Sequence, residues 1–146
     1  MKYALLAFLF FLAGLTLWHV ERDREIYTPI VRIRSNDGLF MTMVQPSTAR
    51  RSGCAAVLER FEEALKTTCT ICAVESTDCA TALEGIDRAL ARGERMPIYT
   101  ISAEGIRVGL LGPPRSVRAE CEAMASQFLK SGLQSASCVA PLPGAG

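Results

Sequence analysis

Six cysteines are the residues of this chain whose type and spacing best suit chemistry. Three of them fall at the start of predicted helices and three lie in or beside predicted strands: Cys54, Cys79 and Cys121 in the first group, Cys69, Cys72 and Cys138 in the second. An even and high number of cysteines in so small a domain is typical of compartments in which disulfides persist. We therefore expect structural disulfides.

The internal repeat described below suggests one bridge in each repeat unit, from the start of a helix to the strand that follows it. This symmetric scheme pairs Cys54 with Cys72 and Cys121 with Cys138. Cys69–Cys79 would then close the connection between the units. Because six cysteines allow about 15 pairings, the scheme is a hypothesis based on symmetry.

Two other uses of the cysteines stay open. The segment Cys69-Thr70-Ile71-Cys72 has the C-x-x-C spacing of a redox pair, but it follows a predicted helix, whereas redox pairs open one. Cys69, Cys72 and Cys79, with one more thiolate, have a spacing that zinc accepts. The single histidine, His19, lies in the apolar N-terminal stretch, so the rest of the chain has no imidazole to serve as a general base. We expect no cofactor, no metal and no enzymatic activity.

Charge excludes one class of partner. The chain has 16 basic and 15 acidic residues, a net charge of +1, and no long run of either sign. A nucleic-acid binder needs a clustered basic face that displaces counterions from phosphates. We expect no nucleic-acid partner.

The N-terminal residues 3–20 carry no formal charge apart from a possible one on His19. This length and composition predict a signal anchor, a single transmembrane helix over residues 1–20, followed by a juxtamembrane linker over residues 21–27. A cleaved signal peptide is the alternative. Arginines beyond this segment oppose export under the positive-inside rule, whereas the cysteines favour it. We expect a single-pass protein of the bacterial inner membrane whose soluble domain lies in the periplasm.

The soluble part contains an internal repeat, since Ser35–Phe61 recurs as Ser102–Phe128 without a gap. Periodicity predicts strands at 28–34, 39–45, 68–75, 98–102, 106–111 and 134–140, and helices at 52–66, 79–92 and 117–131. The predicted fold class is α+β, a duplicated β-hairpin-α-β domain over residues 28–140. Its units are 28–76 and 96–140, the linking helix is 79–92, and 141–146 is a flexible tail. We expect a ferredoxin-like antiparallel sheet with its helices on one face.

Residues 98–140 resemble the second half of a SPOR (sporulation-related repeat) domain. The segment 105–113, Gly-Ile-Arg-Val-Gly-Leu-Leu-Gly-Pro, matches the hallmark of that family with one residue inserted before the Gly-Pro. The helix at 79–92 and the six cysteines depart from the family pattern. The resemblance implies that the open face of the sheet binds peptidoglycan glycan. On this chain that face would carry Phe40, Thr42, Tyr99, Arg107 and Gly109.

These observations lead to three competing functions. The first is a membrane-anchored, disulfide-stabilised extracytoplasmic module that binds peptidoglycan glycan. The second is a non-enzymatic accessory subunit that docks onto an inner-membrane complex, such as a secretion or polysaccharide machine. The third is a thiol oxidoreductase, which needs free Cys69 and Cys72.

Overall fold

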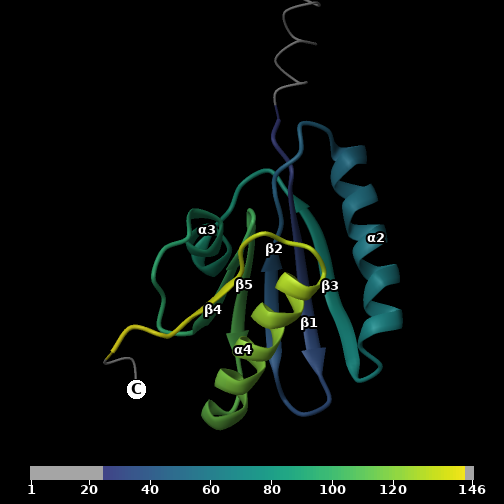
Figure 1. The fold of residues 1–146 in the computed structure, drawn as a ribbon. Helices are drawn as coiled ribbons and strands as arrows, with labels where there is room; N and C mark the ends of the chain where they lie inside the picture. Colours follow the sequence, from purple (N-terminus) through teal and green to yellow (C-terminus); the bar gives the residue numbers. More distant parts are fainter. Residues whose placement is uncertain (1–24, 144–146) are drawn as a thin grey trace, which may run out of the picture.

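Two β-hairpins form the middle of the sheet in the computed structural model, which describes residues 25–143 (Figure 1). β1 (Thr28–Ser35) and β2 (Phe40–Val44) make the first hairpin, and β4 (Tyr99–Ala103) and β5 (Ile106–Leu111) make the second. β2 pairs with β5 and so joins the hairpins. β3 (Cys72–Ala80) and β6 (Ser137–Val139) lie at the edges, and the order is β3-β1-β2-β5-β4-β6 with every pairing antiparallel.

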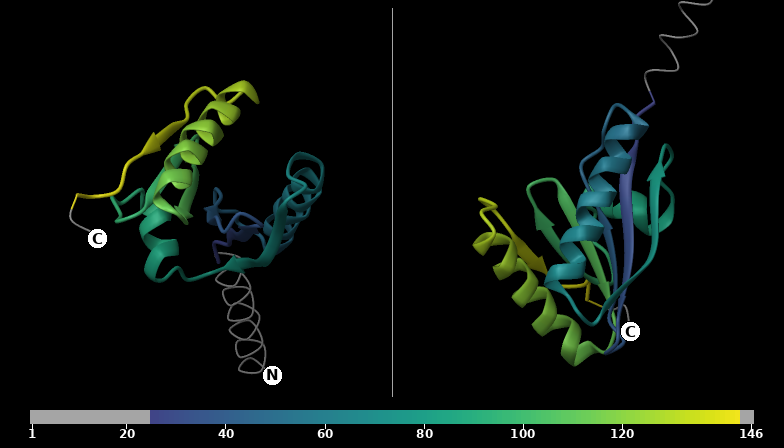
Figure 2. Two further views of the ribbon diagram at one scale, coloured as in Figure 1. Left: turned by 90° about the horizontal axis from the view of Figure 1, so that it is seen from below. Right: turned by 90° about the vertical axis from the view of Figure 1, so that its right-hand side faces the viewer.

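Two long helices cover one face of this sheet. α2 (Arg51–Thr68) packs on β1 and β3, and α4 (Pro114–Lys130) packs mainly on β4 and β6. Each helix turns its apolar stripe toward the sheet, so that Leu58 and Val117 join the main core. Figure 2 shows α2 and α4 on the same side of the sheet and well separated from each other.

The third helix, α3 (Gly85–Arg92), lies on the opposite face, where Leu90 and Val44 form a second, smaller core with Met96 (Figure 2). The expectation that all helices share one face is therefore wrong. β2 places apolar residues on both of its sides, Met41 and Met43 toward α2 and α4, and Val44 toward α3. A strand that is apolar on both sides requires cover on both faces of the sheet.

Each half of the domain consists of a hairpin, a helix and an edge strand. In the first half β2 and β3 flank β1, and in the second β5 and β6 flank β4. A ferredoxin-like sheet interleaves the strands of its two β-α-β units. Here, within residues 25–143, the strands of the two halves lie side by side in the sheet and pair with each other through β2 and β5, so the arrangement is not ferredoxin-like.

The two hairpin turns differ in length by one residue. Ser35 pairs with Leu39 across a three-residue loop, whereas Ala103 pairs with Ile106 across a two-residue loop. The alignment of Ser35–Phe61 with Ser102–Phe128 therefore pairs structurally equivalent residues from the turns onward. In the strands before the turns, β1 and β4, it is off by one residue. Because side chains alternate between faces along a strand, a shift of one residue changes the face of every side chain.

The linking helix is shorter than expected and begins at Gly85, because β3 continues to Ala80. The whole of β3 pairs with β1, with an irregularity in register between Arg32 and Ile33. Cys79 and the apolar residues after it have helical spacing. Pairing of β3 with β1 nevertheless keeps Cys79 in the strand. At the other edge, β6 is only three residues long, whereas periodicity predicted a strand over 134–140.

The expected membrane anchor at residues 1–20, most of the linker at 21–27 and the end of the tail at 141–146 lie outside the described residues. Within residues 25–143, no helix has the length and apolar character needed to cross a bilayer.

Candidate functional site

Three disulfides connect the six cysteines. Cys121 bonds to Cys138, the pairing expected for the second unit. The other two expected pairs are wrong, because Cys54 bonds to Cys79 and Cys69 bonds to Cys72. The error follows from the linking helix: once β3 extends to Ala80, Cys79 becomes a strand residue that lies opposite the start of α2.

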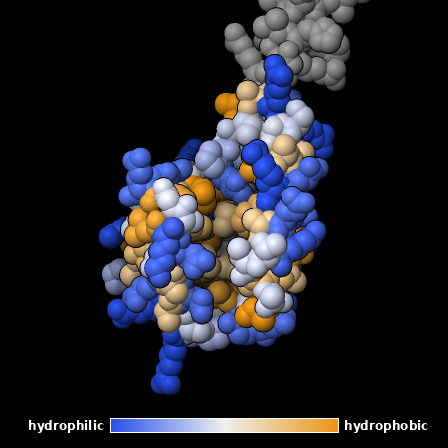
Figure 3. Space-filling view, turned by 45° about the vertical axis from the view of Figure 1, so that its right-hand side comes forward, coloured by the Kyte–Doolittle hydropathy of each residue, from blue (hydrophilic) through white to orange (hydrophobic). Residues whose placement is uncertain are grey.

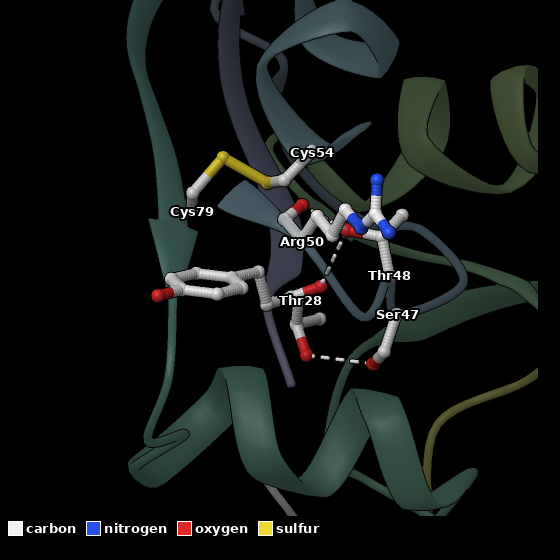
Figure 4. Close-up of a disulfide and its surroundings, with 7 residues drawn as sticks. Thr28, Ser47, Thr48, Arg50, Cys54 and Cys79 are labelled. Carbon is white, nitrogen blue, oxygen red and sulfur yellow. Dashed lines mark hydrogen bonds between the residues drawn. A yellow bond between two sulfur atoms is a disulfide. The ribbon is translucent and has the colours of Figure 1, made fainter. Parts of the chain in front are cut away.

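The Cys54–Cys79 bridge sits beside a small polar cluster at the beginning of β1 (Figure 4). The Thr28 and Ser47 hydroxyl oxygens are 2.8 Å apart, and the backbone N–H groups of Tyr27 and Thr48 each donate to the other residue's carbonyl. The bridge therefore ties α2 to the edge strand at the point where the chain enters the sheet. Its role is structural.

The Cys69–Cys72 bridge closes the C-x-x-C segment where α2 ends. The helix ends at Thr68, so these sulfurs lie at the negative end of the helix dipole, which disfavours a thiolate. Cys69, Cys72 and Cys79 cannot together bind zinc while the disulfides are formed, because Cys79 bonds to Cys54. Among residues 25–143 no cluster of His, Cys, Asp or Glu side chains is suited to hold a metal ion.

Four of the five predicted ligand residues share the sheet face that carries α3. Thr42 pairs with Gly109, and two residues away Val44 pairs with Arg107 while Phe40 pairs with Leu111. The fifth, Tyr99, pairs with Leu110 and packs into the main core beneath α4. The two-residue turn between β4 and β5 sets this register and so places Tyr99 on the opposite face.

α3 covers the middle of the predicted ligand face. Thr42 is only 5% exposed, and a Cβ built on Gly109 would lie 3.0 Å from the Cδ1 of Ile98 and 3.2 Å from the Cδ1 of Leu90. Arg32 on β1 holds α3 in place through a 2.6 Å ion pair with Asp87. Thr42 and Gly109 are therefore packing residues that a ligand does not reach.

Phe40 and Arg107 lie at opposite ends of the ladder between β2 and β5. Four residue steps separate their pairs, which corresponds to about 14 Å along the strands. With α3 packed between them, the two side chains do not form one small site. Of the five predicted residues, Arg107 is the one that lines a polar pocket.

We call this the Arg107 pocket: a hollow of about 380 Å³ beside the C-terminal end of α3, over β4, β5 and β6. Its polar wall carries the hydroxyls of Thr100, Ser102 and Ser137 together with Glu94 and Arg95, and its apolar wall carries Leu90 and Val139. Arg107 donates a hydrogen bond to Ser102, and its guanidinium lies against Gly93, the residue that ends α3. The cation is therefore held in place by a hydroxyl and by the negative end of a helix.

The sequence did not predict the hollow on the other face, between α2 and α4. We call it the central groove; it has a volume of about 330 Å³ and is mainly apolar (Figure 3). Its walls include Phe61 from α2 and Phe128 from α4, and its floor includes Met41 and Met43 from β2. Both phenylalanines belong to apolar stripes that are visible in the sequence, but no pattern indicates how far apart two helices lie.

Comparison of the chain with protein-family models, curated proteins and solved structures found no match.

Proposed function

We propose that this protein is a non-enzymatic binding module of the bacterial cell envelope whose Arg107 pocket holds a polysaccharide, with peptidoglycan glycan as the expected ligand. One observation carries the proposal: three hydroxyls and a fixed guanidinium converge from β4, β5 and β6 on one hollow. Its volume of about 380 Å³ falls within the range of small-ligand pockets, about 300–1,000 Å³.

The chemistry of the pocket suits a sugar. The hydroxyls of Thr100, Ser102 and Ser137 both donate and accept hydrogen bonds, as sugar hydroxyls do. The planar guanidinium of Arg107 donates to carbonyl or carboxylate oxygens, groups that acetylated and acidic sugars carry. Leu90 and Val139 offer apolar contact to the C–H groups of a sugar ring. The resemblance of segment 105–113 to SPOR domains supports peptidoglycan as the polysaccharide.

Two features support the cellular location. Three disulfides in a small domain are typical of an oxidising compartment, which favours the periplasm. The uncharged residues 3–20 favour a single N-terminal membrane anchor in the inner membrane. In the proposed role the protein is thus a tether, with its N-terminal end in the membrane and its sheet facing the cell wall.

Co-sedimentation with purified peptidoglycan sacculi tests the proposal, with the oxidised full-length chain kept in mild detergent. We expect the chain to pellet with sacculi, and Thr100→Val combined with Ser137→Ala to abolish most of the pelleting. Arg107→Lys keeps the charge but loses the planar fork, so it should also weaken binding. Phe40→Ala is the matched control, because Phe40 shares the sheet face but lies outside the pocket. A folded, oxidised chain that does not pellet would refute peptidoglycan binding.

The second candidate, an accessory subunit of an inner-membrane secretion or polysaccharide complex, is favoured by the central groove, an apolar surface suited to a protein partner.

A thiol oxidoreductase has less support, since it needs the Cys69–Cys72 bridge to open and close in turnover. The double variant Cys69→Ser with Cys72→Ser should still bind sacculi if the bridge is structural. A folded double variant that lacks a thiol–disulfide exchange activity shown by the wild type would support the redox role.

A further inference from the structure

The distance between α2 and α4 is unusually large for two helices on one sheet. α2 lies over β1 and β3, whereas α4 lies over β4 and β6, so two strands separate the strands they cover. At about 4.8 Å per strand the helix axes are about 14–19 Å apart. Packed helices are about 8–10 Å apart. The central groove is therefore wide enough to admit further protein between them.

The walls of the groove are matched by the internal repeat. Phe61 and Phe128 both line the groove and occupy equivalent positions of α2 and α4; Met124 also lines it, and its equivalent, Val57, lines an adjoining hollow. Phe61, Phe128 and Met124 are all half-buried, so part of each ring or thioether is available to a partner. Methionine on the floor and wall adapts its shape to different apolar surfaces, as in promiscuous helix-binding grooves.

The two ends of the groove differ in charge. Glu120 on α4 lines the groove near Cys69 and Cys72, where α2 ends. Arg60 on α2 lies at the other end, where it lines an adjoining hollow with Val57 and Phe61. Neither Arg60 nor Glu120 takes part in the ion pairs formed within residues 25–143. Arg60 donates from its Nε to the Ala56 carbonyl and keeps its charge free of a carboxylate partner among the described residues, so an apolar surface with a cation at one end and an anion at the other fits an occupant of complementary charge.

We propose that the central groove binds an amphipathic helix of a partner protein. The partner helix presents apolar residues at i, i+3, i+4 and i+7 to the phenylalanines and methionines, an acidic residue to Arg60 and a basic residue to Glu120. The apolar residues 3–20 of this chain are a poorer occupant, because they carry no acidic residue and no lysine or arginine. A lipid chain likewise has no group that would pair with both Glu120 and Arg60.

Photo-crosslinking with synthetic helices tests this proposal in the full-length chain held in lipid nanodiscs. The probe is an amphipathic peptide of four turns with a leucine face, a benzophenone side chain at its centre, and one Glu and one Lys at its two ends. Peptides with the same face and Glu at both ends, or Lys at both ends, are the mismatched probes. We expect the matched probe to crosslink to α2 and α4 residues that line the groove, and to do so saturably.

Two variants locate the binding. Ala123 is exposed and lines the groove, so Ala123→Arg should lower the affinity at least tenfold, which is about 1.4 kcal/mol. Ala119→Arg is the matched control, because Ala119 is exposed on the same helix but does not line the groove. Glu120→Lys makes both ends of the groove basic and should transfer the preference to the probe with Glu at both ends.

Several results would overturn the proposal. These are crosslinks confined to residues 1–24 or to lipid, equal labelling by all three peptides, and unchanged labelling of Ala123→Arg. Crosslinks between two copies of the chain that Ala123→Arg removes would assign the groove to self-association instead. The groove lies on the opposite face of the sheet from the Arg107 pocket, so failure of this test leaves the test with sacculi unaffected.

Discussion

The two halves of the domain share one plan and differ in how it is reinforced. Each half has a hairpin, a helix on the same face of the sheet, and a disulfide from that helix to the edge strand: Cys54–Cys79 in the first and Cys121–Cys138 in the second. The edge strand of the first half spans nine residues, against three in the second. The first half also carries the Cys69–Cys72 bridge, which has no equivalent in the second.

The comparison separates features of the fold from features suited to a specific ligand. What both halves share, the stripes, the turn glycines and the helix-to-strand bridges, has a structural explanation in each. What breaks the symmetry is α3, the Arg107 pocket beside it, and the opposite charges of Glu120 in the groove and Arg60 in the adjoining hollow. The regions in which the two halves differ are therefore the expected functional sites.

The largest expected effects come from removing the equivalent disulfides. In a chain-entropy model, the Cys54–Cys79 bridge, with a sequence separation of 25, contributes about 3.5 kcal/mol, and Cys121–Cys138, with a separation of 17, about 3 kcal/mol. Urea unfolding of the two double alanine variants, each with the remaining bridges intact, measures both. We expect losses that are similar to each other.

The unmatched bridge serves as the control for that comparison. Cys69–Cys72 spans only three positions, so the same model assigns it about 1.5 kcal/mol. A loss on removing Cys69–Cys72 as large as that from either long bridge would contradict the entropic explanation and indicate that the bridge holds the end of α2 against β3.

A substitution that makes the two halves more alike should lower the free energy of unfolding by an intermediate amount. Thr42 and Gly109 are equivalent in the repeat and also pair with each other, so Gly109→Thr imposes symmetry at the centre of the sheet. The new side chain would collide with Ile98 and Leu90, and overpacking of this kind costs about 1–3 kcal/mol. Hydrogen exchange should show faster opening of α3. Unchanged protection there would contradict the packing of α3 on this face, and Thr42→Gly, which introduces no clash, is the matched variant.

The smallest expected effect on the free energy of unfolding concerns the first hairpin turn, between β1 and β2. In this turn, the Ser35 hydroxyl and the Leu39 N–H donate to Asp37, which lowers the pKa of that carboxyl below its ordinary value. The resulting stabilisation is present above about pH 4, where an unfolded Asp is ionised, and is lost as pH falls through the lower folded pKa. Asp37→Asn should therefore be less stable than wild type at neutral pH and equal to it near pH 2. A difference that persists in acid would assign the effect to geometry instead of charge.

Sequence patterns predicted most elements, and their failures have a common cause. Residues 106–111 form the predicted strand, and the two long helices lie within a few residues of their predicted positions. The spacing of Cys79 from the apolar residues after it is helical and predicts a helix there. Pairing with β1 placed it in a strand instead, and its disulfide partner changed as a consequence. Among the predicted ligand residues, only Arg107 lines the pocket, because α3 covers Thr42 and Gly109, while Tyr99 faces the main core.

The sequence by itself determined the local elements, the duplication and the α+β class, because periodicity and turn residues act within a few positions of each other. Only the tertiary structure decided which cysteines meet, which face α3 covers, and that α2 and α4 stand far enough apart to leave a groove. These outcomes depend on strand register and on contacts between distant segments, and a single residue in a hairpin turn is enough to exchange the two faces of a strand.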